Sequence, residues 1–305
     1  MKNLIVTPAP HIKETSIPMG DVIVALVPAL AAGLWFFGVR AFWVILATTL
    51  SAVVFEMISL KLRKMKITPK DIVSAAVTGL LLSFCVSSAM PWWIMIIASF
   101  ISIVIAKHAF GGLGFNIFNP ALVGRAFLLT SWPVLMTTWY RPFDAVTGAT
   151  PLSLLKESKV ITDYAVMFFG NHGGSIGETS AVALLIGAIY LLYRRTIEIR
   201  IPLSYLLTVA LMSAIFRVDP VFNLLAGGVL LGAFYMATDP VTSPVTKPGR
   251  WVFGFGCGFI TMVIRLWGGY PEGVCYAILV MNATTPLLDR YLQGRIFGRK
   301  TWNTL

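Results

Sequence analysis

Apolar runs that are each about as long as a membrane-spanning helix recur along the whole chain, and they constrain its fold more than any other feature. A helix needs about 20 such residues to cross a hydrocarbon core of about 30 Å. Bounded by charge, proline or glycine, the runs predict ten helices. These cover residues 21–39, 41–60, 71–88, 91–107, 117–132, 177–193, 201–217, 220–237, 250–266 and 272–289. We therefore expect an all-α polytopic membrane protein, with 117–132 its weakest span because that run is short and contains Arg125.

The composition leaves no room for a soluble domain. Only 12% of the residues are charged and 57% are hydrophobic, whereas soluble domains are about 25% charged. Residues 1–20 are polar and contain three prolines, with no apolar core or small-residue cleavage site. We therefore expect a short cytoplasmic segment there and not a cleaved signal peptide.

The net charge of +11 reflects membrane topology better than nucleic-acid binding. With the N-terminus in the cytoplasm, 17 of the 24 Lys and Arg residues fall on the cytoplasmic side and six on the other, with Arg125 inside the membrane. Such an excess follows the positive-inside rule. It predicts a multi-pass membrane protein with both termini cytoplasmic and no nucleic-acid partner.

The two halves of the chain resemble each other. FNIFNPALVGR (115–125) is echoed by LVMNATTPLLDR (279–290), and the runs after Asp71 and Asp219 share a pattern of small residues, glycine and leucine. Each half holds five predicted spans, so the second would enter the membrane inverted, as in many transporter folds. We expect two inverted five-helix repeats at 21–132 and 177–290, an extracytoplasmic loop at 133–176 and a cytoplasmic tail at 291–305; the alternative is chance similarity between apolar helices.

The long loop contains the most specific motif, DAVTGAT at residues 144–150. Gly148 and Ala149 remove bulk around the Thr150 hydroxyl, which would leave that hydroxyl accessible as a nucleophile. Asp144 could bind a metal or polarise a phosphate donor. An enzyme could thus attach a bulky group to Thr150, although a plain polar turn would have the same composition.

This motif resembles the flavinylation motif D-x-x-(S/T)-G-A-(S/T), and with GFNIFNPALVGRAF (114–127) and NATTPLLDR (282–290) it makes the whole chain resemble one family. That family contains the D-type membrane protein of Rnf electron-transport complexes and the B-type protein of the Na⁺-translocating NADH:quinone reductase. The short N-terminal segment fits the Rnf protein better. The resemblance implies FMN joined to Thr150 through a phosphodiester, with Asp144, Thr147, Gly148 and Ala149 completing the motif that a flavin transferase reads.

The resemblance also implies a second, noncovalent flavin, riboflavin, inside the membrane. Asn116 and Asn119, at the start of a helix beside Pro120, are the candidates to bind it, and Arg125 is a further one. Asn282 and Pro286 occupy the comparable place in the second half. Amides at a helix start can bind a polar ring, or they can simply cap the helix.

Other polar residues inside apolar runs allow several interpretations because charges there are costly. Arg125 could bind a flavin or quinone-like oxygen, face a carboxylate of a partner, or reach the membrane edge. Glu56 is expected to pair with Lys61 near the cytoplasmic boundary, with an ion-path role as the alternative. Asp239 is expected to fix a proline-rich turn, and His108 to be an interfacial residue.

The three cysteines, Cys85, Cys257 and Cys275, show no metal-binding spacing. We expect them to be packing residues; the alternative is that one of them contributes to a cluster shared with another protein of the complex.

The resemblance implies a flavin-carrying subunit, in the cytoplasmic (inner) membrane of a bacterium or archaeon, that relays electrons across the bilayer. The complex as a whole would couple electron transfer between ferredoxin and NAD⁺ to Na⁺ or H⁺ translocation. The chain has no GxGxxG motif after a strand, so it would not reduce NAD⁺ by itself. Implied partners are the A, B, C, E and G proteins of an Rnf complex, a flavin transferase and membrane lipid. The alternatives are the B-type protein of the quinone reductase and a stand-alone transporter or channel, which would have no use for the flavinylation motif.

Overall fold

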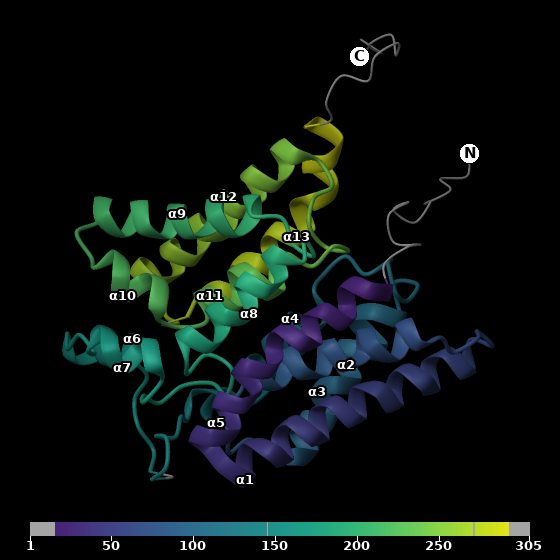
Figure 1. Ribbon diagram of the computed structural model, residues 1–305, viewed down its shortest axis with the longest axis horizontal. Helices are drawn as coiled ribbons and strands as arrows, with labels where there is room; N and C mark the ends of the chain where they lie inside the picture. Colours follow the sequence, from purple (N-terminus) through teal and green to yellow (C-terminus); the bar gives the residue numbers. More distant parts are fainter. Residues whose placement is uncertain (1–15, 145, 271, 293–305) are drawn as a thin grey trace.

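The computed structural model describes residues 16–144, 146–270 and 272–292, so most of the expected N-terminal segment and tail lie outside the described residues. The elements of the described part are helices joined by loops (Figure 1). They are α1 (Ser16–Leu62), α2 (Pro69–Phe84), α3 (Trp92–Phe100), η2 (Ile101–His108), α4 (Pro120–Ser131), α5 (Pro133–Thr137), α6 (Pro151–Ser158), α7 (Tyr164–Phe169), α8 (Ala181–Tyr193), α9 (Arg200–Ile215), α10 (Pro220–Leu225), α11 (Val229–Leu231), η3 (Gly232–Met236), α12 (Lys247–Trp267) and α13 (Val274–Tyr291).

The first element, α1, consists of two limbs. Gly38 breaks the helix with φ 59° and ψ −142°, a conformation that glycine adopts at no steric cost. From this break the two limbs run in opposite directions (Figure 1). The sequence prediction of separate helices at 21–39 and 41–60 is therefore confirmed.

Several predicted spans are shorter or broken. The run 117–132 forms only α4, which has 12 residues and is about 18 Å long at 1.5 Å per residue. The prediction of one helix over 220–237 is wrong. Gly227 and Gly228 have φ of 59° and 70°, so the chain breaks between α10 and α11. The predicted helix 177–193 begins only at Ala181, after a non-helical segment.

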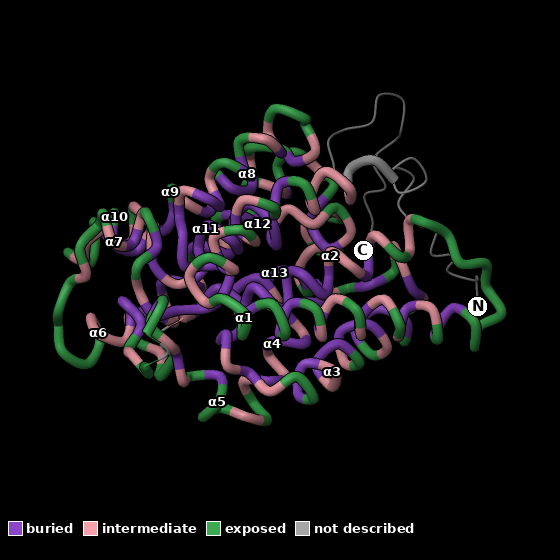
Figure 2. The backbone as a smooth tube through the Cα atoms, turned by 60° about the horizontal axis from the view of Figure 1, so that its bottom comes forward, coloured by how far each residue is buried: buried purple, intermediate pink, exposed green. Residues whose placement is uncertain are grey.

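Two described stretches are long and apolar enough to cross a bilayer, Met19–Leu62 and Lys247–Trp267. Their neighbours also present apolar side chains outward. On α9, the exposed residues Leu203, Leu207, Leu211 and Ile215 recur every fourth position, which places them along one side of the helix. Buried and exposed residues alternate in the same way along α1 (Figure 2). Apolar surface of this extent is typical of contact with lipid.

Small residues allow close contacts between the two halves of the chain. A β-carbon added to Gly187, on α8, would lie 1.9 Å from the Ala25 carbonyl oxygen on α1 and 2.2 Å from the Tyr235 hydroxyl. That hydroxyl donates a 2.8 Å hydrogen bond to the Leu184 carbonyl. The backbones of α1 and α8 therefore approach closely because position 187 has no side chain.

We expect Gly187→Ala to lower the free energy of unfolding by about 1–3 kcal/mol, the usual cost of overpacking. The reason is that the new methyl group overlaps a backbone oxygen, which cannot rotate away. Thermal unfolding in detergent measures the effect. The matched control is Gly20→Ala. Gly20 lies on α1, the helix that Gly187 contacts, and nothing lies within 4 Å of the carbon that this substitution adds. Equal melting temperatures for the two variants would contradict the packing argument.

Candidate functional site

The DAVTGAT motif lies on a short hairpin formed by residues 139–148. Tyr140 and Thr147 form an antiparallel bridge, and the Gly148 N–H donates to the Trp139 carbonyl at 2.9 Å. Asp144 lies exposed near the tip. The hairpin thus presents the first residues of the motif to the surroundings.

The Arg141 side chain occupies the space where a side chain at position 148 would lie. A β-carbon at this position would lie 2.8 Å from Cγ and 2.9 Å from Nε of Arg141. Both distances are shorter than a normal contact, so Arg141 could not keep its place beside a larger residue. The motif glycine therefore leaves room for the Arg141 side chain two residues before Thr150.

Thr150 begins α6. Its Oγ1 accepts a 3.2 Å hydrogen bond from the Ser153 N–H and lies 3.0 Å from the Ser153 hydroxyl, the geometry of a helix N-cap. Only 6% of the residue is exposed. Thr150 is therefore buried in this conformation, whereas the sequence led to the expectation of an accessible hydroxyl.

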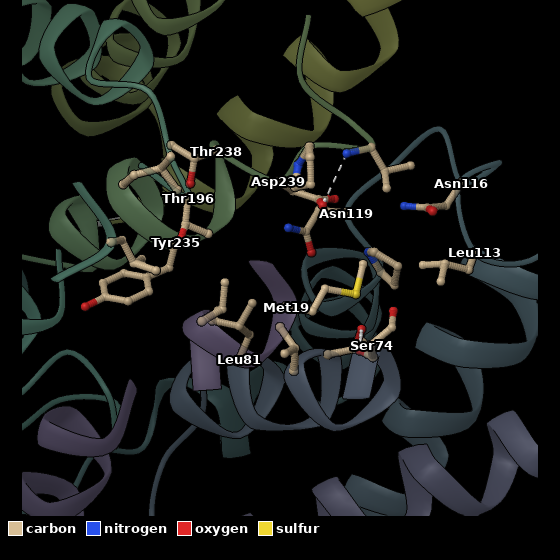
Figure 3. Close-up of a pocket in the computed structure, with 18 of the residues that line it drawn as sticks. Met19, Ser74, Leu81, Leu113, Asn116, Asn119, Thr196, Tyr235, Thr238 and Asp239 are labelled. Carbon is tan, nitrogen blue, oxygen red and sulfur yellow. Dashed lines mark hydrogen bonds between the residues drawn. The ribbon is translucent and has the colours of Figure 1, made fainter. Parts of the chain in front are cut away.

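A second region of interest is a pocket between several helices. Its lining comes from α1, α2, η2, the start of α4, α8, η3 and the loops that precede α4 and follow α8 and η3. Figure 3 shows Asn119 and Asp239 on one side, with Leu81 across from them. Apolar walls with a few polar groups suit a planar ring with polar edges.

The structure brings Asn116 and Asn119 to this pocket, but Asn119 already makes several hydrogen bonds. Its Oδ1 caps α4 by accepting from the N–H groups of Ala121 and Leu122. Its Nδ2 donates to the Met236 carbonyl at 3.2 Å. Asn116 makes a weaker contact, a 3.3 Å bond from Nδ2 to the Phe118 carbonyl. Asn116 is therefore the better placed of the two to bind a ligand.

Asn119 also contacts Asn282 in the second half of the chain. The expectation that Asn282 begins a helix, as Asn119 does, is wrong, because Asn282 and Pro286 lie inside α13. The backbone N–H of Asn119 donates to Oδ1 of Asn282 at 3.1 Å, and Nδ2 of Asn282 donates to the Thr242 carbonyl at 3.2 Å. The two asparagine motifs that resemble each other in sequence are therefore in direct contact.

Lys107, to which the sequence assigned no role, lines the pocket. It is 1% exposed and donates to Glu56 Oε2 at 2.9 Å and to Ser74 Oγ at 3.1 Å. The predicted pairing of Glu56 with Lys61 is wrong, because Glu56 faces inward while Lys61 is exposed. His108 is also buried, against Glu56, and its position relative to the membrane interface stays a prediction.

Asp239 fixes the turn that follows η3, as predicted. Its carboxylate accepts from the Val241 N–H and from the Thr242 hydroxyl at 3.1 Å. Burial raises the pKa of Asp239 above its usual value, and these hydrogen bonds and Lys107 oppose the rise.

Arg125 is not among the residues that line the pocket. It is buried, forms an ion pair with Glu272 and donates from Nε to the Cys85 carbonyl at 3.2 Å. Its carboxylate partner is thus within the chain, and its contact with a flavin stays a prediction. Glu272 was missed because it lies in a loop and far from Arg125 in sequence.

The cysteines are buried and form no disulfide. Cys275 Sγ lies 3.4 Å from the Leu122 carbonyl. In the described ranges, no group of three or more His, Cys, Asp or Glu residues could bind a metal. A contribution to a cluster shared with another protein of the complex stays an untested alternative.

Apolar outer faces, two long apolar helical stretches and an internal pocket with mostly apolar walls are the features of a helical membrane protein. The chain belongs to the NQR2, RnfD, RnfE family, whose model matches residues 5–298. It is 49% identical to the D component of the Na⁺-translocating ferredoxin:NAD⁺ oxidoreductase complex of Acetobacterium woodii, over 97% of this chain and 96% of that protein. It is 46% identical to the D component of the proton-translocating ferredoxin:NAD⁺ oxidoreductase complex of Clostridium ljungdahlii, over 97% of this chain and 96% of that protein. It is also 38% identical to the D component of the ion-translocating oxidoreductase complex of Stutzerimonas stutzeri, over 92% of this chain and 91% of that protein.

Proposed function

We propose that this chain is the D component of a membrane complex that couples electron transfer between ferredoxin and NAD⁺ to ion translocation, and that it relays electrons through bound flavin. One observation carries the proposal. The DAVTGAT hairpin occurs in a chain that matches two D components at 49% and 46% identity over nearly its full length. The other proteins of the Rnf complex (A, B, C, E and G) would supply the NAD⁺ site and the iron–sulfur clusters.

The covalent flavin would be FMN on Thr150, and the local structure suits its phosphate. The attachment atom already faces the N-terminus of α6, where it accepts from the Ser153 N–H; helix N-termini favour phosphate groups. Arg141 crosses Gly148 close by and adds a positive charge. FMN would supply one- and two-electron redox chemistry, while these residues hold its phosphate in place.

The test is covalent attachment. The chain co-expressed with a flavin transferase should run on a denaturing gel as a fluorescent band, and the chain expressed without the transferase should run as a dark one. A dark band in both lanes would reject the covalent flavin.

A second flavin, riboflavin, would occupy the pocket described above. The fit rests on its apolar walls from Leu81, Leu191 and Phe234 and on its polar groups, notably Asn116 and Lys107. These residues would bind the ring and exclude water from it.

Asn116→Leu is expected to weaken riboflavin retention about tenfold, because one hydrogen bond to a buried polar group contributes about 1–1.5 kcal/mol. Riboflavin extracted from purified protein measures the effect, and the melting temperature without flavin should stay close to that of the wild type. Asn119→Leu is unsuitable alone because it also removes the cap of α4. An unchanged riboflavin content would exclude Asn116 from the site.

The topology that accompanies this proposal places both termini in the cytoplasm and the hairpin on the outer side of the cytoplasmic membrane. It rests on the distribution of Lys and Arg. The two halves would form inverted repeats around a shared axis. The support for this is the sequence resemblance between FNIFNPALVGR and LVMNATTPLLDR, whose asparagines Asn119 and Asn282 are in contact. Cysteine labelling of positions 144 and 198 from either side of the membrane would test the sidedness.

A further inference from the structure

A row of buried ionisable side chains joins the pocket to the surface at the end of α1. It begins at Lys107, whose Nζ lies 2.9 Å from Glu56 Oε2. On the other side of the same carboxylate, Glu56 Oε1 lies 3.2 Å from His108 Nε2. Neither of these two buried atoms makes an aligned hydrogen bond with a described residue. A proton placed between them would bridge the gap.

Arg63 lies between His108 and the surface as a fixed positive charge that itself passes no proton. Its Nη1 lies 3.3 Å from His108 Nδ1 and donates to the Gly111 carbonyl at 2.8 Å. Arg63 is exposed, whereas Glu56 is fully buried. His108 therefore has one ring nitrogen toward the surface and the other toward the interior, the arrangement by which imidazole passes protons.

We propose that His108, Glu56 and Lys107 form a proton relay between the cytoplasmic surface and the pocket. The inference rests on the proposed function, which supplies the ligand in the pocket and the electron that the proton accompanies. Lys107 gives a proton from Nζ to a basic nitrogen of the ligand. His108 passes a proton through Glu56 to the resulting amine, and water reprotonates His108. One cytoplasmic proton enters the pocket, and every side chain returns to its initial state.

The contacts favour a proton over a sodium ion. The ammonium group of Lys107 occupies the space between Glu56 and Ser74 and takes an oxygen from each. A metal cation would have to displace this charge from a buried position, and an unpaired buried charge is costly. Asp71 and Asp239 add negative charge near Lys107, and Arg63 faces His108. The pH range in which the relay transfers protons therefore depends on these groups as well.

The test follows proton uptake directly. Purified, riboflavin-containing protein is photoreduced by a light flash in weakly buffered detergent, and a pH indicator and flavin absorbance are recorded together. Glu56→Gln should slow proton uptake by about 10²-fold, a typical contribution of positioned acid–base groups. The double variant Glu56→Gln/Lys107→Met leaves no unpaired charge, and its proton uptake should be as slow as that of Glu56→Gln. The result then does not depend on whether the single variant misfolds. Lys61→Gln, an exposed neighbour on α1, should match the wild type.

Chemical rescue separates proton transfer from a structural role. His108→Ala should also be slow, and added imidazole should restore the rate. Pyrrole has the same ring shape without a basic nitrogen and should not restore it. Wild-type uptake rates in flavin-loaded Glu56→Gln protein, or a rate that depends on Na⁺ instead of on these residues, would overturn the relay alone. Purified wild-type protein without riboflavin would overturn both the relay and the pocket assignment.

Discussion

Thr150→Ala is expected to abolish the in-gel flavin fluorescence, because no other hydroxyl occupies the final position of the motif. Thr150→Ser should retain it, since serine offers the same nucleophile and is an equally good N-cap. Fluorescence is compared at equal protein loading with the transferase co-expressed. A fluorescent Thr150→Ala band would show that the flavin is attached elsewhere.

The alanine variant also removes the cap of α6, which costs about 0.5–2 kcal/mol, so a folding control is needed. Ser153→Ala removes the neighbouring hydroxyl at 3.0 Å but leaves Thr150 and its backbone donor intact. It should remain fluorescent. Because the Thr150 hydroxyl is buried, we also expect the transferase to act on a conformation in which α6 has moved away from it, and flavinylation of the folded chain to be slower than during synthesis.

Arg125→Met is expected to lower the free energy of unfolding by about 3–5 kcal/mol, the usual cost of removing one partner of a buried ion pair. The side chains of Arg125 and Glu272 are only 6% and 14% exposed, so the substitution leaves Glu272 without its counter-charge inside the protein. It also leaves the Cys85 carbonyl without its donor. Unfolding in mixed detergent micelles measures the loss.

Two further variants separate charge from packing. Arg125→Met/Glu272→Gln removes both charges and should recover much of the stability. Arg194→Met breaks a pair with Asp21 in which the arginine side chain is 47% exposed, and it should cost about 0–1 kcal/mol. Similar losses for Arg125→Met and Arg194→Met would mean that the Arg125 pair is not protected from solvent.

Most helices could be located from the sequence because the length of an apolar run depends only on residues that are neighbours in the chain. The prediction was least reliable where backbone conformation interrupts an apolar run. Ala226, Gly227 and Gly228 do not interrupt the apolar run. The helix α10 ends there because Gly227 and Gly228 have positive φ angles. The shortness of α4 was foreseeable from Arg125 and Pro120, whose costs in a membrane helix are visible in the residues themselves.

The site was predicted unevenly for a related reason. Asn116, Asn119 and the DAVTGAT motif could be found because each is a compact pattern. Lys107 pairs with Glu56 across 51 positions and Arg125 with Glu272 across 147, and such distant pairs leave no local signal. The predicted Glu56–Lys61 pair failed because sequence proximity was used in place of three-dimensional contact. Burial of Thr150 depends on the packing of α6, which the motif does not encode.

Under the proposed topology, the break at Gly38 would determine which compartment the flavin-bearing hairpin faces. The two limbs of α1 run in opposite directions, so residues 16 and 62 lie at the same end of this helical pair (Figure 1). A continuous helix would put them at opposite ends and invert every later segment, including the hairpin at 139–148. One residue with positive φ in α1 would therefore set the direction in which electrons cross the bilayer, more than 100 positions before Thr150.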